Sequence, residues 1–351
     1  MKRVNRPPSR GPLTGRSAAM FVGVGAVLAV SALLVRYRTR NTERANPPTG
    51  TFLETDGVRL HYIERGEGEP LVLLHGNGTM IDDMTISGLV ELAAKRYRVF
   101  VFDRPGFGHS ERPSNITWTA QAQARLLRHA LGRLGVERPI VLGHSWGTLV
   151  ALALALDYPK YVRSLVLLAG YYFPTPRLDV PVLSVPAIPV LGHLLRHSIS
   201  PWLGRLMWPA VRRKLFGPAP APKRFDAFPV WMTLRPSQLR AAAAETALMI
   251  PATMALRHRY GELEMPVVIC TGLDDRLIDK KQSVRLHQRV PHSNLSVLPG
   301  MGHMIHHLAA DNVMAAIVSA NTTTKRAAAA NDEHGLASRE RNHELLDAKA
   351  V

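Results

Sequence analysis

The strongest constraint on the fold is a regular alternation of short apolar runs with stretches of helical periodicity. The apolar runs lie at residues 70–74, 97–102, 139–143 and 162–168. Residues 119–135 carry apolar side chains at helical spacing and close on a glycine, and residues 149–159 follow the same pattern. Strands that alternate with helices form a mostly parallel sheet covered on both faces. The chain is therefore predicted to have an α/β fold, preceded by a β-hairpin that turns at Asp56-Gly57.

Residues 171–260 interrupt this alternation. They are rich in proline, contain Trp202, Trp208 and Trp231, and show no strand-like pattern. A segment of this kind between two strands of a sheet is expected to be an insert that covers the sheet's edge. We therefore predict a helical lid over residues 171–260.

The sheet pattern returns after the lid. Apolar strands are predicted at 265–272 and 294–300, and a closing helix over 309–320. The folded core is then expected to comprise residues 51–170 and 261–320. The tail, residues 321–351, is rich in alanine and charged residues and is predicted to be disordered, with a loose helix as the alternative.

A stretch without charges lies near the N-terminus, at residues 17–35 between Arg16 and Arg36. At about 1.5 Å per residue it is long enough to cross a bilayer core of roughly 30 Å. Its flanks are predicted to be a basic tail, 1–16, and a linker, 36–50, which disfavours a buried helix. A signal peptide is the competing interpretation, although no small-residue cleavage site follows the stretch. We expect a single-pass membrane anchor, with its orientation left open by basic residues on both sides.

The formal net charge of +17 is confined to two regions. Residues 1–50 hold nine Lys/Arg and one Glu, residues 171–260 hold twelve Lys/Arg and three Asp/Glu, and the remainder is balanced. A nucleic-acid-binding protein would place its basic face on the folded core, so no nucleic-acid partner is expected. The distribution favours an anionic membrane surface, with a merely solvated lid as the alternative. The single cysteine, Cys270, excludes an internal disulfide.

The sequence GHSWG, residues 143–147, places Ser145 between two glycines where a predicted strand meets a predicted helix. A nucleophile elbow has this context, because its turn is too tight for side chains two residues on either side. The serine there adopts a strained backbone that projects its hydroxyl above the sheet. A plain glycine turn is the alternative, since the motif is short.

A serine hydroxyl becomes a nucleophile when a base takes its proton and an acid orients that base. Asp274 and Asp275 lie in the loop after the strand at 265–272, and His303 follows the last strand. All three loops leave the carboxyl ends of parallel strands, where the active sites of such sheets lie. Asp275 is preferred as the acid, three residues after Gly272, and Asp274 is the alternative.

Two further histidines, His306 and His307, follow the predicted base. No carboxylate or cysteine at ligand spacing joins them, so we expect a packing role and no bound metal. Nothing in the chain predicts another cofactor.

Hydrolysis also requires hydrogen-bond donors for the oxyanion that forms on the substrate. The backbone N–H of Trp146, next to Ser145, is one candidate. The motif HGNG, residues 75–78, directly follows a strand and offers the N–H of Asn77 as the second. His75 in the same motif is expected to be a structural histidine bonded to the loop backbone.

The motifs HGNG, DRPGFGHSERP, GHSWG, GLDDRLI and GMGHMIHH, at their spacing over residues 51–320, resemble those of the α/β-hydrolase fold superfamily. Within it, the chain is similar to the serine hydrolase branch with a lid insert. The resemblance implies that Ser145 is the nucleophile, Asp275 the acid and His303 the base. It also implies oxyanion donors at Asn77 and Trp146.

Other branches of the superfamily fit less well. Dehalogenases and epoxide hydrolases resemble this pattern but carry aspartate at the position of Ser145, and proline iminopeptidases have GGSWG in place of GHSWG. The resemblance also implies that Asp103 has a structural role in the loop near the site.

The sequence thus predicts a membrane-anchored serine hydrolase that cleaves a carboxylic ester through an acyl-enzyme. A small-molecule or lipid ester suits the apolar side chains of the lid. A carbon–carbon bond hydrolase and a cofactor-free haloperoxidase use the same triad and remain alternatives. A ligand receptor on a hydrolase scaffold would show a damaged triad, which this sequence does not.

Overall fold

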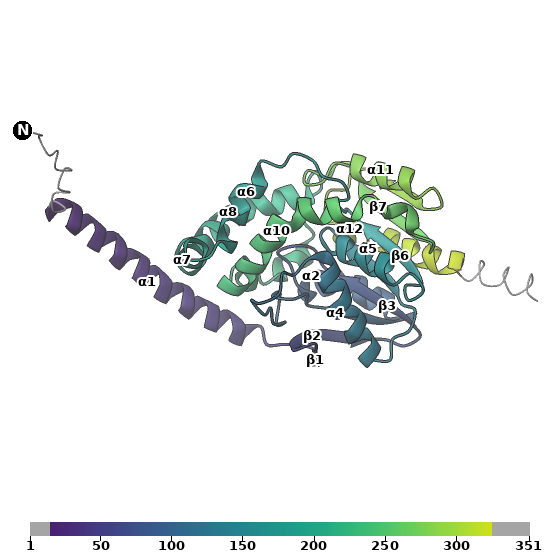
Figure 1. Cartoon of the computed structure of the whole chain (residues 1–351), viewed down its shortest axis with the longest axis horizontal. Coiled ribbons are helices and arrows are strands. Elements are labelled where there is room, and N and C mark those ends of the chain that lie inside the picture. The colour runs from purple at the N-terminus through teal and green to yellow at the C-terminus, as the bar shows by residue number, and fades with distance from the viewer. Residues whose placement is uncertain (1–14, 325–351) are drawn as a thin grey trace, which may run out of the picture.

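A mostly parallel eight-stranded sheet forms the centre of the molecule (Figure 1). The computed structural model describes residues 15–324. The strands are β1 (Thr51–Thr55), β2 (Val58–Arg65), β3 (Glu69–Leu74), β4 (Tyr97–Phe102), β5 (Ile140–His144), β6 (Ser164–Leu168), β7 (Val267–Gly272) and β8 (Asn294–Leu298). Their order is β1-β2-β4-β3-β5-β6-β7-β8, with β2 antiparallel to both neighbours and all other pairs parallel. The predicted α/β-hydrolase fold is confirmed.

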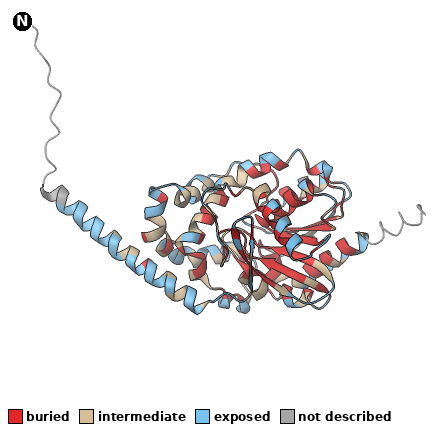
Figure 2. Cartoon of the chain, turned by 60° about the horizontal axis from the view of Figure 1, so that its bottom comes forward, coloured by how far each residue is buried: buried red, intermediate tan, exposed pale blue. Residues whose placement is uncertain are grey.

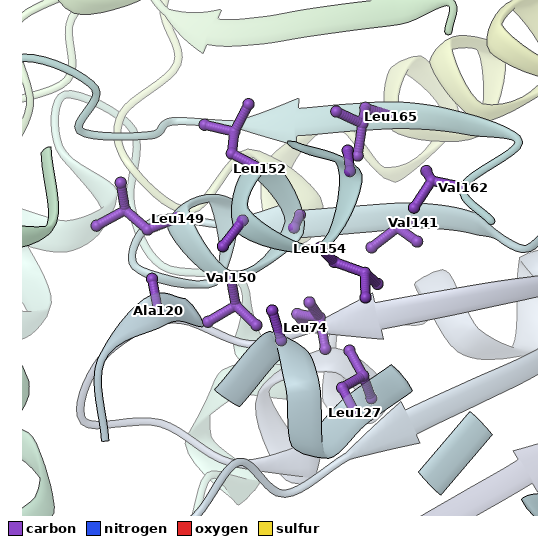
Figure 3. Close-up of a cluster of buried hydrophobic side chains, with 14 of the residues drawn as sticks. Leu74, Ala120, Leu127, Val141, Leu149, Val150, Leu152, Leu154, Val162 and Leu165 are labelled. Atoms are coloured by element: carbon purple, nitrogen blue, oxygen red, sulfur yellow. The ribbon is translucent and has the colours of Figure 1, made fainter. Parts of the chain in front are cut away.

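Helices cover both faces of this sheet. On one face lie α4 (Ala120–Arg133), α5 (Gly147–Asp157) and α11 (Lys281–Arg289). The other face is covered by α2 (Ile81–Ile86), α3 (Leu89–Ala93) and a helix described over residues 310–324. Figure 3 shows how the leucines and valines of α5 pack against strand residues such as Leu74 and Val141. The strand-helix alternation read from the sequence therefore corresponds to two separate apolar layers.

The predicted hairpin joins β1 and β2. Its two turn residues, Asp56 and Gly57, have φ values of 50° and 71°. Both lie in the left-handed region, as the tight turn of a two-residue hairpin requires. The hairpin adds the two antiparallel strands at one edge of the sheet.

The lid, residues 171–260, lies between β6 and β7 and is helical. Its α-helices are α6 (Asp179–Ser184), α7 (Leu191–Ser198), α8 (Ser200–Phe216), α9 (Val230–Thr233) and α10 (Pro236–Leu256). Short 3-10 turns, η1 (Val185–Ala187), η2 (Lys223–Ala227) and η3 (Tyr260–Glu262), connect them or follow the last. In Figure 1 these helices gather at one end of the sheet.

The N-terminal helix differs from the expectation at its C-terminal end. α1 runs from Gly15 to Ala45, so most of the predicted linker, 36–50, is helical. Contacts with the lid explain the extension: Glu43 pairs with Arg235 at 2.9 Å, and Arg38 lies over the ring of Trp231. These partners lie far away in the sequence.

α1 is long and apolar enough to cross a membrane, with a mean hydropathy of 2.1 in its most apolar window. A signal sequence near an N-terminus has the same properties. Most of the helix is exposed (Figure 2). Exposed apolar side chains over that length are expected to be covered by something other than this domain.

The closing helix, described over residues 310–324, confirms the prediction for 309–320 and continues into the predicted tail. Asn321 donates a hydrogen bond to Glu69 at the start of β3, which ties these residues to the core. The rest of the predicted disordered tail, and residues 1–14 of the predicted basic tail, lie outside the described residues.

Candidate active site

Ser145 occupies a strained turn between β5 and α5. Its φ of +52° lies in the left-handed region, which a residue with a side chain rarely adopts. A Cβ atom on Gly143 would lie 2.6 Å from the carbonyl oxygen of Gly147, and one on Gly147 would lie 2.4 Å from the carbonyl oxygen of Leu74. Both positions therefore need glycine. This geometry is that of a nucleophile elbow and excludes the plain-turn alternative.

His303 and Asp275 are paired at the carboxyl end of the sheet. Nδ1 of His303 lies 2.7 Å from Oδ2 of Asp275, and the two side chains are 3% and 0% exposed. The other carboxylate oxygen accepts hydrogen bonds from the N–H groups of Leu277, at 2.7 Å, and Ile278, at 3.0 Å. Asp275 and His303 therefore lie in the arrangement expected of an acid that orients a base.

Asp275 is an anion in this setting. Burial acts to raise the pKa of its carboxyl group, but the His303 ring and the two backbone N–H groups outweigh burial and lower the pKa. An ionised Asp275 accepts a hydrogen bond from the N–H at Nδ1 of His303, which leaves Nε2 as the basic nitrogen. The alternative acid, Asp274, instead binds the N–H of Gly300 at 3.0 Å and is exposed.

The two proposed oxyanion donors lie at the wall of one cavity with Ser145. Within residues 15–324, the backbone N–H groups of Asn77 and Trp146 donate to no protein acceptor. Trp146 also stands at the N-terminus of α5, the positive end of that helix's dipole. Two unpaired donors beside a nucleophile are suited to binding a developing negative charge.

His75 has the structural role that the sequence predicts. Its Nδ1 lies 2.8 Å from the carbonyl oxygen of Gly76, and its Nε2 accepts the N–H of Arg104 at 3.0 Å. Burial, aided by the Arg104 charge, lowers the pKa of His75 to about 3. The ring is therefore neutral and shapes the HGNG loop.

Arg104 and Glu245 form a buried ion pair that the sequence reasoning missed. Nη2 of Arg104 lies 3.0 Å from Oε2 of Glu245, and both side chains are at most 2% exposed. Arg104 also donates to the carbonyl oxygens of His75 and Gly76. The Glu245 backbone oxygen accepts the indole N–H of Trp146 at 3.0 Å. Because Glu245 belongs to α10, this pair joins the lid to both loops that carry the predicted oxyanion donors.

Asp103 shapes the loop next to the site, as the family resemblance implies. Its carboxylate accepts the N–H groups of Ile81 and His109, each at 2.9 Å, and contacts Nδ1 of His61 at 2.7 Å. Burial acts to raise the pKa of Asp103, but the His61 contact outweighs it and lowers the pKa.

No carboxylate lies at ligand spacing from His306 and His307 in the sequence, but the fold brings one to them. Asp83, from α2, lies 3.2 Å from Nε2 of His306 and 2.9 Å from Nε2 of His307. All three side chains are fully buried. Burial acts to raise the pKa of Asp83, but the two rings hold it well below its usual value. The carboxylate is 224 positions from His307, so spacing within the sequence gives no sign of it.

The Asp83 cluster supports the loop that carries His303. His306 and His307 lie on the short helix α12 (Ile305–Leu308), directly after that residue. The ring of His144 contacts the rings of both His303 and His306 in a tilted arrangement, and its Nε2 donates to the carbonyl oxygen of His303 at 3.1 Å. Although Asp83, His144 and His306 bring ligand atoms within 4.8 Å of one another, imidazoles already face the carboxylate. We therefore assign the cluster a positioning role.

Ser145 and His303 share a cavity of about 270 Å³ beneath the lid. Apolar side chains make up much of its wall: Leu149, Leu183, Val211, Leu215, Met249, Leu277, Ile278 and Met304. Lys214 and the ion pair of Arg177 with Asp179 also line it. A largely apolar cavity with a few charged groups is typical of a small-molecule site.

Comparisons with known proteins agree with this geometry. The family model described as the alpha/beta hydrolase fold matches residues 69–310, so the chain belongs to the α/β-hydrolase fold family. It is 27% identical over 282 residues to haloalkane dehalogenase 2 of Mycobacterium tuberculosis, covering 78% of this chain and 94% of that protein. It is 28% identical over 282 residues to 2-hydroxymuconate semialdehyde hydrolase of Pseudomonas putida, covering 75% and 90%.

Among solved structures, an α/β hydrolase fold protein from Burkholderia ambifaria superposes with a TM-score of 0.64 at 22% identity. The match covers 77% of this chain and 97% of that one, and it supports the fold. Together with the elbow and the paired Asp275 and His303, these similarities identify an enzyme of the α/β-hydrolase family.

Proposed function

We propose that this protein is a membrane-anchored serine hydrolase that cleaves a carboxylic ester through an acyl-enzyme intermediate. The proposal rests on one observation: three features of a serine hydrolase lie together at one cavity. These are the strained Ser145, the buried pair of His303 with Asp275, and two unpaired backbone donors.

In the first half of the reaction, Oγ of Ser145 attacks the ester carbonyl carbon while Nε2 of His303 takes the hydroxyl proton. The negative charge that forms on the carbonyl oxygen is bound by the N–H groups of Asn77 and Trp146. When the carbon–oxygen bond breaks, His303 gives its proton to the departing alcohol. Asp275 remains ionised and stabilises the imidazolium.

In the second half, His303 takes a proton from water, and the resulting hydroxide attacks the acyl group on Ser145. The same two N–H groups bind the second oxyanion. Collapse releases the carboxylic acid and returns the proton to the serine oxygen.

The serine disfavours the activity of the dehalogenase relative. Displacement of a halide by Ser145 would leave an alkyl ether, which has no carbonyl group for water to attack. A carboxylate nucleophile would instead leave a hydrolysable ester. Turnover therefore requires a substrate with an acyl group when the nucleophile is a serine.

The wall of the cavity supports an apolar acyl group as the part of the substrate beneath the lid. Side chains such as Leu149 and Met249 offer no hydrogen-bonding groups there. The length and hydropathy of α1 support attachment of the enzyme to a membrane.

A fluorophosphonate probe, which reacts with activated serines, tests the nucleophile. The full chain in detergent should take the label, the Ser145→Ala variant should not, and Ser237→Ala, at an exposed serine in the lid, should react like wild type. A series of p-nitrophenyl esters from acetate to long-chain acids then tests the substrate, with the rate expected to rise with chain length. A folded wild-type protein that takes no label and cleaves no ester would contradict the proposal.

A carbon–carbon bond hydrolase is the second candidate. The similarity to the Pseudomonas putida hydrolase supports it, as does Lys214 at the cavity wall, whose charge suits an anionic substrate. A dienol substrate of that class loses its ultraviolet absorbance on cleavage. Faster loss of that absorbance than of any ester would favour this candidate.

A further inference from the structure

Exposed apolar side chains are concentrated on the lid. Outside α1, twelve large apolar residues that are more than a third exposed lie between residues 178 and 211, and we call them the lid apolar face. They are Leu178, Val182, Leu183, Ile188, Val190, Leu191, Leu194, Ile199, Leu203, Leu206, Met207 and Val211. Among the other described residues after α1, Met254 and Leu273 are also exposed large apolar side chains, but they lie outside this segment. So many exposed large apolar side chains within one short segment of a folded domain indicate a contact site.

The helix α8 carries both apolar and basic exposed side chains. Leu203, Leu206 and Met207 belong to the lid apolar face. Arginines of the same helix line a neighbouring open groove, together with Arg276 and Trp208: they are Arg205, Arg212 and Arg213. Helices that lie in a membrane interface have this composition, with leucines and tryptophan toward the acyl chains and basic groups toward phosphates.

α1 holds the lid at a defined position along the membrane-length segment. The Ser31 hydroxyl donates to the carbonyl oxygen of Ser198 at 2.7 Å and accepts the indole N–H of Trp202 at 3.1 Å. Ser31 lies only about 6 Å along the helix axis from Val35, the last residue of the uncharged stretch 17–35. With residues 17–35 across a bilayer, the junction of α7 and α8 therefore lies where acyl chains meet headgroups. Figure 1 shows α7 beside α1.

The catalytic cavity meets the same surface. Leu183 of α6 and Val211 of α8 line the cavity, and they are 56% and 39% exposed. They are therefore shared between the cavity wall and the lid apolar face. The acyl chain of an amphiphile that leaves the bilayer at this point would move from the apolar bilayer interior directly into the apolar catalytic cavity.

We propose that the lid apolar face inserts into an anionic lipid bilayer and that the enzyme takes an amphiphilic ester from that bilayer between Leu183 and Val211. The substrate class rests on the proposed ester hydrolase function. The bilayer is the occupant of the face because α1 is hydrogen-bonded to the lid within its own apolar stretch. The arginines of α8 complement the charge of acidic phospholipids.

Insertion is tested without catalysis by a fluorescent label in the full chain. The single natural cysteine, Cys270, is buried, so a Leu206→Cys variant can be labelled selectively with an environment-sensitive nitrobenzoxadiazole dye. In vesicles of phosphatidylglycerol and phosphatidylcholine, we expect a blue shift and quenching by spin-labelled acyl chains. Met254→Cys, 53% exposed on α10, is the matched control and should show neither.

Equal quenching at the two positions would overturn the proposal. A label at position 206 that is shielded in detergent and is not quenched by lipid would also overturn it, because a second protein molecule would then cover the face. Neither outcome depends on whether the enzyme cleaves esters.

Delivery is tested with a Val190→Glu/Leu206→Glu double variant, at side chains 85% and 78% exposed. Against a long-chain ester embedded in the vesicles, its rate should fall about tenfold or more, since charged groups resist entry into the acyl region. Against dissolved p-nitrophenyl butyrate the rate should stay within about twofold of wild type, and Met254→Glu should change neither rate. Equal slowing on both substrates would contradict bilayer delivery, whereas a wild type inactive on both would contradict the ester hydrolase itself.

Discussion

Two helices that carry many apolar side chains, α5 in the core and α8 in the lid, differ in how far those side chains are buried. Every residue of α5 from Gly147 to Leu156 is buried, whereas α8, with seventeen residues, buries Pro201 and Phe216 alone. Figure 2 shows the same contrast between the sheet region and the lid. The core helix stabilises the fold by removing apolar area from water, while the lid keeps much of its apolar area on the surface. Apolar composition therefore serves stability in the core, whereas on the lid it forms the exposed surface for which we propose contact with a bilayer.

The largest effect is expected at the active site, on removal of the Asp275 charge that orients His303. In Asp275→Asn, an amide can donate to Nδ1 of His303 and stabilise the wrong tautomer. The value of kcat at neutral pH should fall roughly 10⁴-fold, or about 5 kcal/mol in activation free energy. Asp274→Asn is the matched control, because Asp274 faces the N–H of Gly300. A larger loss in the control would reverse the assignment of the acid.

The next effect concerns the core apolar layer. Leu152 of α5 is fully buried in the cluster of Figure 3. Replacement by alanine leaves a cavity and should lower the free energy of unfolding by about 2–5 kcal/mol. Guanidinium unfolding in a fixed detergent measures the change, and an effect below about 0.5 kcal/mol would mean that this layer is less closely packed than the structure indicates.

A smaller effect is expected from the buried Asp83 cluster. Asp83→Asn removes a charged acceptor from His306 and His307 and should cost about 1.5–3 kcal/mol in stability at pH 7. The pKa of Asp83 is depressed in the folded state, so its contribution is complete above the unfolded value of about 4 and is lost as the pH falls through the folded value.

Unfolding of both proteins from pH 7 down to pH 3 measures this linkage. The difference between wild type and Asp83→Asn should shrink below about pH 4. A difference that stays constant over the whole range would contradict an ionised Asp83. If the cluster also positions His303, the kcat of Asp83→Asn should fall while its KM stays close to that of wild type.

The smallest effect is expected on the lid. Leu206→Ala makes the same chemical change as Leu152→Ala, but at a side chain that is 78% exposed. The free energy of unfolding in detergent should change by no more than about 0.5 kcal/mol. A loss as large as that of the core variant would remove the contrast between the two regions.

The sheet and the elbow were predictable because their signals are local. Each buried strand is a contiguous apolar run, and the glycines that permit the turn at Ser145 are two residues away from it. The pairing of His303 with Asp275 followed from the order of loops on a parallel sheet. To predict these features, it is enough to know the residues near each position in the chain and the architecture that such alternating strands and helices adopt.

Other parts of the site were not predictable. Arg104 pairs with Glu245, 141 positions later, and Asp83 lies 224 positions before His307. The helical conformation of residues 36–45 likewise depends on contacts such as that of Glu43 with Arg235. Nothing near these residues in the chain indicates their partners.

The sequence by itself determined the order of strands and helices, the strained serine and the residues that can act on its proton. These depend on backbone sterics and apolar periodicity, which act over a few residues. The tertiary structure decided which buried charges meet, how the lid is joined to the oxyanion loops, and where the apolar lid surface lies along α1. Those outcomes depend on the free-energy cost of burying an unpaired charge and on contacts between segments that are distant in the chain. Local sequence patterns carry no information about either.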